Sequence, residues 1–239
     1  MPRNKYPEET MRRIMDVSLK LFLEKGFEQT TVLDIVDNLG GLTRGAFYHH
    51  FKSKEEVLEA IFKTDSAENS PYTIAYQVPV SNGSERLKLA WKIALQSKIE
   101  NDHQVEVWKF GLSVLSNPRF LAESLKETKK DAEQMAAIME EGMADGSLKK
   151  GNAKIISELF LLLISVWMMP AIFEQDKEEM LAKIALIEQI TIGLGYNFID
   201  DELRDLFINL VNIMNNPNVP YENFSNGNSS TGTSSQCED

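Results

Sequence analysis

The sequence predicts an all-α protein in which a small N-terminal group of short helices precedes a larger helical domain. Apolar residues recur at three- and four-residue spacing through most of the chain, as amphipathic helices require. Sustained period-two alternation, the pattern of half-buried strands, does not occur. With 239 residues, of which 43% are hydrophobic, the chain has enough material for a core and for two domains.

The first two helices are separated by a glycine. Met11, Ile14 and Leu21 fall on one face of a helix over residues 7–25, which Gly26 ends. The second helix follows Thr31, whose capping-box partner three residues later is an aspartate. We expect the second helix to end at the Gly40–Gly41 pair.

Two further helices complete this first group. Thr43 is placed to cap a short third helix over residues 44–49. Ser53 and Glu56 form a second capping-box pattern, which opens a fourth helix over residues 54–64.

The rest of the chain divides at prolines, glycines and polar clusters. Residues 65–83 contain Pro71 and Pro79 and are predicted to be a linker or an irregular loop. The polar composition after residue 214 predicts a disordered tail. We therefore expect domains at residues 1–64 and 65–214 and a tail at 215–239. Within the second domain, helices are expected over residues 84–101, 103–116, 118–145, 152–173, 176–194 and 200–214.

The composition excludes several classes of protein. The single cysteine, Cys237, allows neither an intrachain disulfide nor a cysteine-based zinc site. The longest uncharged apolar run, residues 159–173, has 15 residues, whereas a membrane span needs about 20. The chain opens without a secretory signal, so we expect a cytoplasmic protein with no membrane contact.

Charge is distributed unevenly. Residues 1–64 carry ten basic and ten acidic side chains, so the later residues supply the whole net charge of −11. Residues 41–54 contain Arg44, Lys52 and Lys54 and no acidic side chain. A locally basic segment in an acidic protein is a candidate for binding a polyanion, although a run of this length without an acid also occurs by chance.

The third helix carries the functional prediction. Two helices joined by a short glycine-containing turn form a helix-turn-helix, whose second helix can enter the major groove of DNA. At 100° per residue, Phe47 faces the core, whereas Arg44, Gly45, Tyr48 and His49 face outward. A glycine costs about 1 kcal/mol relative to alanine inside a helix, but it lets another surface approach closely.

The outward side chains suit contact with DNA. Arg44 can bind the O6 and N7 atoms of guanine. The tyrosine hydroxyl, the histidine rings and the ammonium groups of Lys52 and Lys54 suit phosphate oxygens. A lysine in the first turn of the fourth helix opposes the helix dipole, which a neighbouring phosphate would explain. The alternative is that all of these are ordinary surface residues.

The sequence resembles the DNA-binding domain of the tetracycline-repressor (TetR) family. The resemblance is carried by the stretch Phe27–Thr31, the apolar Ile35 and the segment Gly41–Leu58. The resemblance covers residues 8–64. It implies an all-helical regulator with three N-terminal DNA-binding helices and a C-terminal domain for ligand binding and dimerisation. Repression is the commoner mode of action in this family, and no cofactor, metal or enzymatic activity is implied.

The resemblance also assigns roles to residues. It implies that Thr31 and Thr43 contact phosphate, and that Arg44 and Gly45 meet base edges, with Ala46 restricted to a thymine methyl group or to no contact. Backbone contacts are implied for Tyr48, His49, His50 and Lys54. Three residues depart from the usual family pattern, namely Gly40, Ala46 and His49. These departures affect which operator sequence the protein binds.

The second half of the chain predicts a dimer and an effector pocket. The helices over residues 152–173 and 176–194 are apolar on more than one face, so each needs two packing surfaces. The resemblance implies that they pair with their copies in a homodimer, although burial within a monomer is the alternative. A partly apolar small-molecule effector is expected, and the residues suggested for its pocket, which are equally typical of plain core, are Trp91, Trp108, Phe110, Met135, Met139 and Trp167.

Two other functions compete with DNA binding. A helical-bundle metal enzyme would use paired Glu-x-x-His motifs, but only Glu100 and His103 form such a pair. A bundle that only binds other proteins would leave the segment from Arg44 to Lys54 unexplained. Binding to a duplex DNA operator is therefore the favoured prediction.

Overall fold

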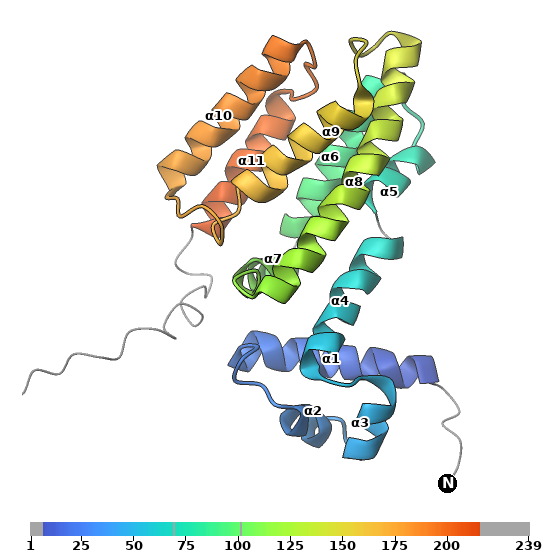
Figure 1. The fold of residues 1–239 in the computed structure, drawn as a ribbon, viewed down its shortest axis with the longest axis vertical. Helices are drawn as coiled ribbons and strands as arrows, with labels where there is room; N and C mark the ends of the chain where they lie inside the picture. Colours follow the sequence, from blue (N-terminus) through green and yellow to red (C-terminus); the bar gives the residue numbers. More distant parts are fainter. Residues whose placement is uncertain (1–6, 69, 101, 216–239) are drawn as a thin grey trace, which may run out of the picture.

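The computed structural model describes residues 7–68, 70–100 and 102–215, with side chains described for residues 8–62, 70–100, 102 and 104–215. Every regular element in these ranges is a helix, which confirms the predicted all-α class (Figure 1). The predicted tail lies outside the described residues except for Asn215. The elements in chain order are α1 (Pro7–Lys25), α2 (Val32–Asn38), α3 (Arg44–His50), α4 (Lys54–Glu68), α5 (Pro71–Gln77), α6 (Gly83–Ile99), α7 (Asp102–Val114), α8 (Pro118–Asp145), α9 (Ala153–Leu162), the π-helix η1 (Leu163–Trp167), α10 (Lys177–Leu194) and α11 (Asp201–Met214).

Figure 1 shows α1 lying across one end of the molecule, with α2 and α3 beneath it. Helix α4 rises from this end toward the long helices α6 and α8. Helix α9 lies against α8, and α10 and α11 pack against each other beyond it. The short helices predicted to bind DNA therefore lie at one end of the molecule.

The region expected to be an irregular loop is partly helical, so this prediction was wrong. Helix α4 continues to Glu68, and α5 follows with Pro71 in its first turn. Proline is well tolerated at the first position of a helix, because the N–H that it lacks has no partner there. Tyr72 and Ala75 are buried, so packing stabilises this short helix.

The helix predicted over residues 152–173 is shorter and ends in a π-helix. Helix α9 ends at Leu162, and the π-helix η1 follows. Carbonyl groups at such an end need partners, since no following helical turn supplies them. The Lys183 ammonium donates to the Trp167 carbonyl at 3.0 Å, and the Gln175 amide donates to the Met168 carbonyl at 2.8 Å.

Two hydrophobic clusters hold the described residues together. The first joins α1 to α4 and includes Ile14, Phe22, Ile35 and Phe47, each without exposed area. The second contains residues from the helices α5, α6, α8, α9, α10 and α11. The predicted domain boundary at residue 64 falls inside α4, so a continuous helix crosses from one cluster toward the other.

Aromatic contacts connect α7 and α8 to the first cluster. The ring of Phe110 stacks on Phe22 with centroids 6.1 Å apart, and Phe120 meets Phe27 edge to face at 5.3 Å. The Arg119 guanidinium also lies 2.5 Å from the Glu59 carboxylate of α4. The N-terminal helices are thus attached to the rest of the chain by packed side chains as well as by α4.

Replacing Phe110 by alanine should destabilise the protein by about 3–5 kcal/mol, because the substitution leaves a cavity between α1 and α7. Urea unfolding followed by circular dichroism measures the loss. Leu125→Ala is the control, because Leu125 is 41% exposed on α8 and should change stability by no more than about 0.5 kcal/mol. Equal effects of the two substitutions would contradict the joining role of Phe110.

Candidate nucleic-acid interface

The turn between α2 and α3 depends on two glycines with positive φ angles. Gly40 has φ of 59° and Gly41 has φ of 103°. A Cβ atom added at Gly41 would meet no atom within 4 Å, so the backbone conformation and not crowding requires glycine there. This turn sets the direction in which α3 leaves α2.

Helix α3 is oriented as its residue pattern predicts. Phe47 has no exposed area and lies in the first cluster. Arg44, Gly45, Tyr48 and His49 are all exposed on α3. The helix begins at Thr43, whose hydroxyl accepts a hydrogen bond from the Ala46 N–H at 3.2 Å. The cap leaves the Thr43 hydroxyl proton available to a ligand.

Gly45 leaves an open place on this surface. A Cβ atom at this position would meet only the Thr43 hydroxyl oxygen, at 3.9 Å. The fold therefore does not need glycine here, although glycine weakens a helix by about 1 kcal/mol relative to alanine. Glycine at this exposed position would let another surface approach the helix backbone closely.

The side chains beside Gly45 are partly ordered by aromatic contacts. The Arg44 guanidinium lies over the Tyr48 ring, 5.6 Å from its centroid. The rings of His49 and His50 meet edge to face at 5.4 Å. Burial, and then the neighbouring His49, lower the pKa of His50. This surface, which we call the α3 face, consists of Thr43, Arg44, Gly45, Tyr48 and His49; Ala46 and His50 are half-buried at its edge.

Thr31 caps α2 through a complete capping box. Its hydroxyl donates to the Asp34 carboxylate at 2.7 Å and accepts from the Asp34 N–H at 3.1 Å. An ion pair with Lys25 at 2.7 Å, together with the bonds from Thr31, holds the pKa of Asp34 well below its usual range. The capping role predicted for Thr31 is confirmed, whereas its phosphate contact stays a prediction.

The two lysines after α3 differ in their surroundings. Lys52 is exposed, and its backbone N–H donates to the Glu56 carboxylate at 2.5 Å. The Lys54 ammonium donates to the carbonyls of Phe27 and Glu28 at 2.6 and 3.0 Å. These two carbonyl partners account for a lysine in the first turn of α4, so a neighbouring phosphate is not needed to explain it. This contact could not be predicted from the sequence, because the partners lie 26 and 27 positions away.

The residues suggested for the effector pocket do not share one site. Phe110 lies in the first cluster, whereas Trp91, Met135, Met139 and Trp167 belong to the second or pack against it. Trp108 is half-buried on α7. Met135 and Met139 have no exposed area and fill the core. A ligand-binding role for these six residues stays a prediction.

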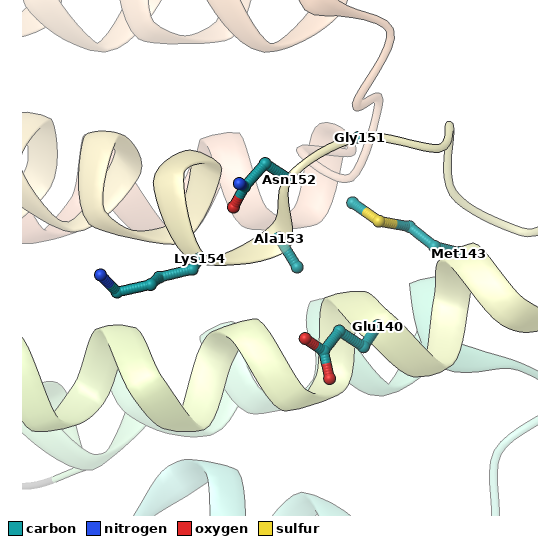
Figure 2. A pocket seen from close by; sticks show the side chains of 6 residues that line it. All are labelled: Glu140, Met143, Gly151, Asn152, Ala153 and Lys154. Atoms are coloured by element: carbon teal, nitrogen blue, oxygen red, sulfur yellow. The ribbon is translucent and has the colours of Figure 1, made fainter.

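A surface cavity of about 360 Å³ lies between α8 and the start of α9. Figure 2 shows Glu140 and Met143 of α8 on one side, with Ala153 and Lys154 of α9 on the other. Gly151 and Asn152 complete the lining. None of the six residues suggested for the effector pocket lines this cavity, and Met143 is its one large apolar side chain.

Among the described residues, no group of three His, Cys, Asp or Glu side chains is placed to hold a metal ion. The side chain of His103, half of the Glu-x-x-His pair, lies outside the described set. No helix in the described ranges is both long enough and apolar enough to cross a membrane.

Comparisons with known proteins agree with this geometry. Residues 14–61 match the family model described as "Bacterial regulatory proteins, tetR family". The chain is 29% identical over 149 residues to the HTH-type transcriptional repressor KstR2 of Mycolicibacterium smegmatis, a match that covers 60% of this chain and 69% of that protein. It is 46% identical over 54 residues to the HTH-type transcriptional regulator SrpR of Pseudomonas putida, covering 23% of this chain and 25% of the relative.

A solved structure extends the likeness beyond the N-terminal helices. A transcriptional regulator of the TetR/AcrR family from Thermobifida fusca aligns with 81% of this chain and 100% of its own, with 26% identity and a TM-score of 0.54. The fold and the α3 face therefore define a helix-turn-helix transcriptional regulator that binds DNA and is not an enzyme. Its N-terminal helices, over residues 14–61, are those of the TetR family of bacterial regulatory proteins.

Replacing Gly45 by alanine should separate stability from DNA binding. The variant should gain up to about 1 kcal/mol of stability, because the new methyl group has space and improves helix propensity. Affinity for duplex DNA should fall, because the methyl group keeps the groove from the helix backbone. Thermal unfolding and fluorescence anisotropy measure the two effects. A variant that is stabilised and binds DNA unchanged would show that Gly45 is not at the interface.

Proposed function

We propose that this regulator is a repressor that binds a pseudo-palindromic DNA operator as a homodimer and is released by a small-molecule effector. Residues 1–64 would bind DNA, and residues 65–214 would dimerise and bind the effector. The observation that carries the proposal is the exposed Gly45 between Arg44 and Tyr48 on a capped helix. Such a regulator works in the cytoplasm, where its operator lies.

The α3 face supplies separate groups for bases and for phosphates. Arg44 can bind guanine with two hydrogen bonds, and Gly45 lets the helix backbone approach the base edges. Ala46 offers only its methyl group, which suits the methyl group of thymine. Our proposed phosphate contacts are Tyr48, His49, His50, Lys52 and the hydroxyls of Thr31 and Thr43. The Lys54 ammonium has a third N–H, which could donate to a phosphate while the other two keep their carbonyl partners.

Selection of bound duplexes from a random pool tests this function directly. The wild-type protein should enrich two related half-sites, and its affinity should fall steeply with salt, because phosphate contacts release counterions. Arg44→Ala should lose preference at one base pair of each half-site, at a cost of about 1–3 kcal/mol per contact. An unchanged motif would show that Arg44 does not read bases, and absence of DNA binding at low salt would overturn the proposed function.

The dimer proposal rests on two exposed, uncharged helix faces. On α9, Ile155, Leu159 and Leu162 recur at four- and three-residue spacing and are 61%, 40% and 51% exposed. The opposite side of α9 packs into the second cluster through Ala153, Phe160 and Leu161. An exposed apolar stripe on a helix that is already packed on its other side favours a protein partner.

Helix α10 carries the complementary surface. Its buried side consists of Met180, Ile184, Ile187 and Thr191. The exposed uncharged residues of this helix follow one another at intervals of one or three positions. They are Ala182, Ala185, Leu186, Gln189, Ile192, Gly193 and Leu194. Small residues in such a stripe let a second helix approach closely, which suits a bundle formed by two copies of α9 and α10. A two-fold dimer would place its α3 helices about 34 Å apart, one turn of DNA.

Replacing Ile192 by glutamate should shift the protein from dimer to monomer, because it places a charge in the proposed interface. Light scattering coupled to size-exclusion chromatography measures the mass. Affinity for a full operator should fall, since one subunit reaches only one half-site. Leu125→Glu on the exposed side of α8 is the matched control and should stay dimeric. A wild-type protein that is monomeric at all concentrations would contradict the proposal.

Effector release would follow from a shift between two dimer geometries. An effector must bind one geometry more tightly than the other in order to change DNA affinity. Helix α4 runs from the first cluster toward the effector domain, which makes it our proposed lever. The stacking of Phe110 on Phe22 offers a second connection between the same two regions. An effector that stabilises the protein yet leaves operator affinity unchanged would contradict this coupling.

A further inference from the structure

The turn between α1 and α2 is held by a side chain from a distant part of the sequence. The Lys54 ammonium, in the first turn of α4, donates to the Phe27 carbonyl at 2.6 Å and to the Glu28 carbonyl at 3.0 Å. It also lies over the Phe27 ring, 4.5 Å from the ring centroid. Hydrogen bonds from a charged donor are about twice as strong as bonds between neutral groups. One side chain therefore binds this turn through three contacts.

The two ends of this turn are fixed by contacts within the first two helices and the turn itself. Gly26, with φ of 86°, follows the end of α1. The buried Thr30 hydroxyl donates to the Gly26 carbonyl at 2.8 Å. Thr31 comes next and caps α2. Lys54 adds a link from this turn to α4, so the position of its ammonium bears on where α2 begins.

The start of α2 matters for DNA binding in two ways. Thr31 is exposed there and is one of our proposed phosphate contacts. Helix α2 also packs beside α3, and Ile35 of α2 shares the first cluster with Phe47 of α3. Phosphate contacts set the register in which base contacts form. A displaced α1–α2 turn would therefore move Thr31 and disturb the packing that orients α3.

We propose that Lys54 is a positioning residue for operator binding, which holds the start of α2 through the Phe27 and Glu28 carbonyls and contributes little as a counter-charge for phosphate. The inference rests on the proposed binding of an operator and assigns a role in it to one residue. Two of the three ammonium N–H groups are already used inside the protein. Breaking these bonds to reach DNA would release the turn that DNA binding needs.

Lys52 provides the contrast within the same segment. Its side chain is exposed and makes no hydrogen bond or ion pair with a described residue, whereas its backbone N–H donates to the Glu56 carboxylate. An ammonium in this state can approach a phosphate without breaking an internal contact. The two lysines therefore differ in what their removal should cost. Removal of the Lys52 charge should reduce electrostatic attraction, whereas removal of the Lys54 ammonium should reduce alignment.

Binding of the full chain to two duplexes tests the proposal. One duplex is the operator obtained by selection, and the other has a random sequence of the same length. Fluorescence anisotropy over a salt series gives the affinity and the slope of its logarithm against the logarithm of the salt concentration. Lys52→Met should weaken binding to both duplexes and lower the size of this slope by about 0.9 per subunit, because one phosphate contact is lost.

Lys54→Met should behave differently from Lys52→Met. Its affinity for the operator should fall about tenfold or more, which is comparable with the loss of a base contact. Its salt slope and its affinity for the random duplex should change less than about half as much as in Lys52→Met. Lys54→Arg should recover most of the operator affinity, because a guanidinium can donate to both carbonyls and stack on the Phe27 ring.

Hydrogen exchange of the free protein supplies a second readout that needs no DNA. In Lys54→Met the backbone amides of residues 26–31 should exchange several-fold faster than in the wild type, because the turn opens locally more often. Lys52→Met and Lys54→Arg should exchange there at close to the wild-type rate. Thermal unfolding confirms that each variant is folded, so faster exchange confined to this turn identifies local loosening.

The two readouts leave the proposal open to contradiction. An equal loss of salt slope in Lys52→Met and Lys54→Met would overturn it, because both lysines would then be phosphate contacts. Unchanged exchange in the turn of Lys54→Met would overturn it as well. A wild-type protein that binds no DNA would contradict the proposed function itself. Equal preference of the wild type and Lys54→Met for the operator over the random duplex would contradict this inference alone.

Discussion

Burial of Phe47 in the first hydrophobic cluster controls how α3 is presented to DNA. The helix has seven residues, too few to be stable alone, so its packing must hold it. Phe47 is its only fully buried side chain, and Phe51 at its C-terminal end is buried as well. These two contacts fix the rotation of the helix about its axis. The exposure of Arg44, Gly45 and Tyr48 is therefore a consequence of the core and not an independent feature.

The same cluster makes the DNA-binding helices sensitive to the rest of the chain. Phe22 of α1 packs against Phe110 of α7, and Phe27, in the turn after α1, packs against Phe120 in the first turn of α8. Since packed cores resist continuous deformation, a shift of α7 would have to rearrange these aromatic contacts or move α1 with it. Helix α4 provides a covalent route between the same regions. An effector in the second domain would thus act on the first cluster from two directions.

Much of the fold could be predicted because its signals are local. The capping boxes of Thr31 and Asp176 form with aspartate and glutamate three residues on, and Gly146 ends α8 with φ of 83°. The errors arose where tertiary packing decides. Pro71 begins a helix that is stabilised by buried neighbours, and Lys54 binds carbonyls of a distant loop.

The distribution of charge affects DNA binding by this regulator. Residues 41–54 have no acidic side chain, whereas residues 65–239 carry the entire net charge of −11. Because the larger domain repels phosphate, DNA is favoured only where the α3 face is presented, which suppresses binding in wrong orientations. Weak general attraction to DNA also means that discrimination must come from base contacts made by a few side chains around Gly45.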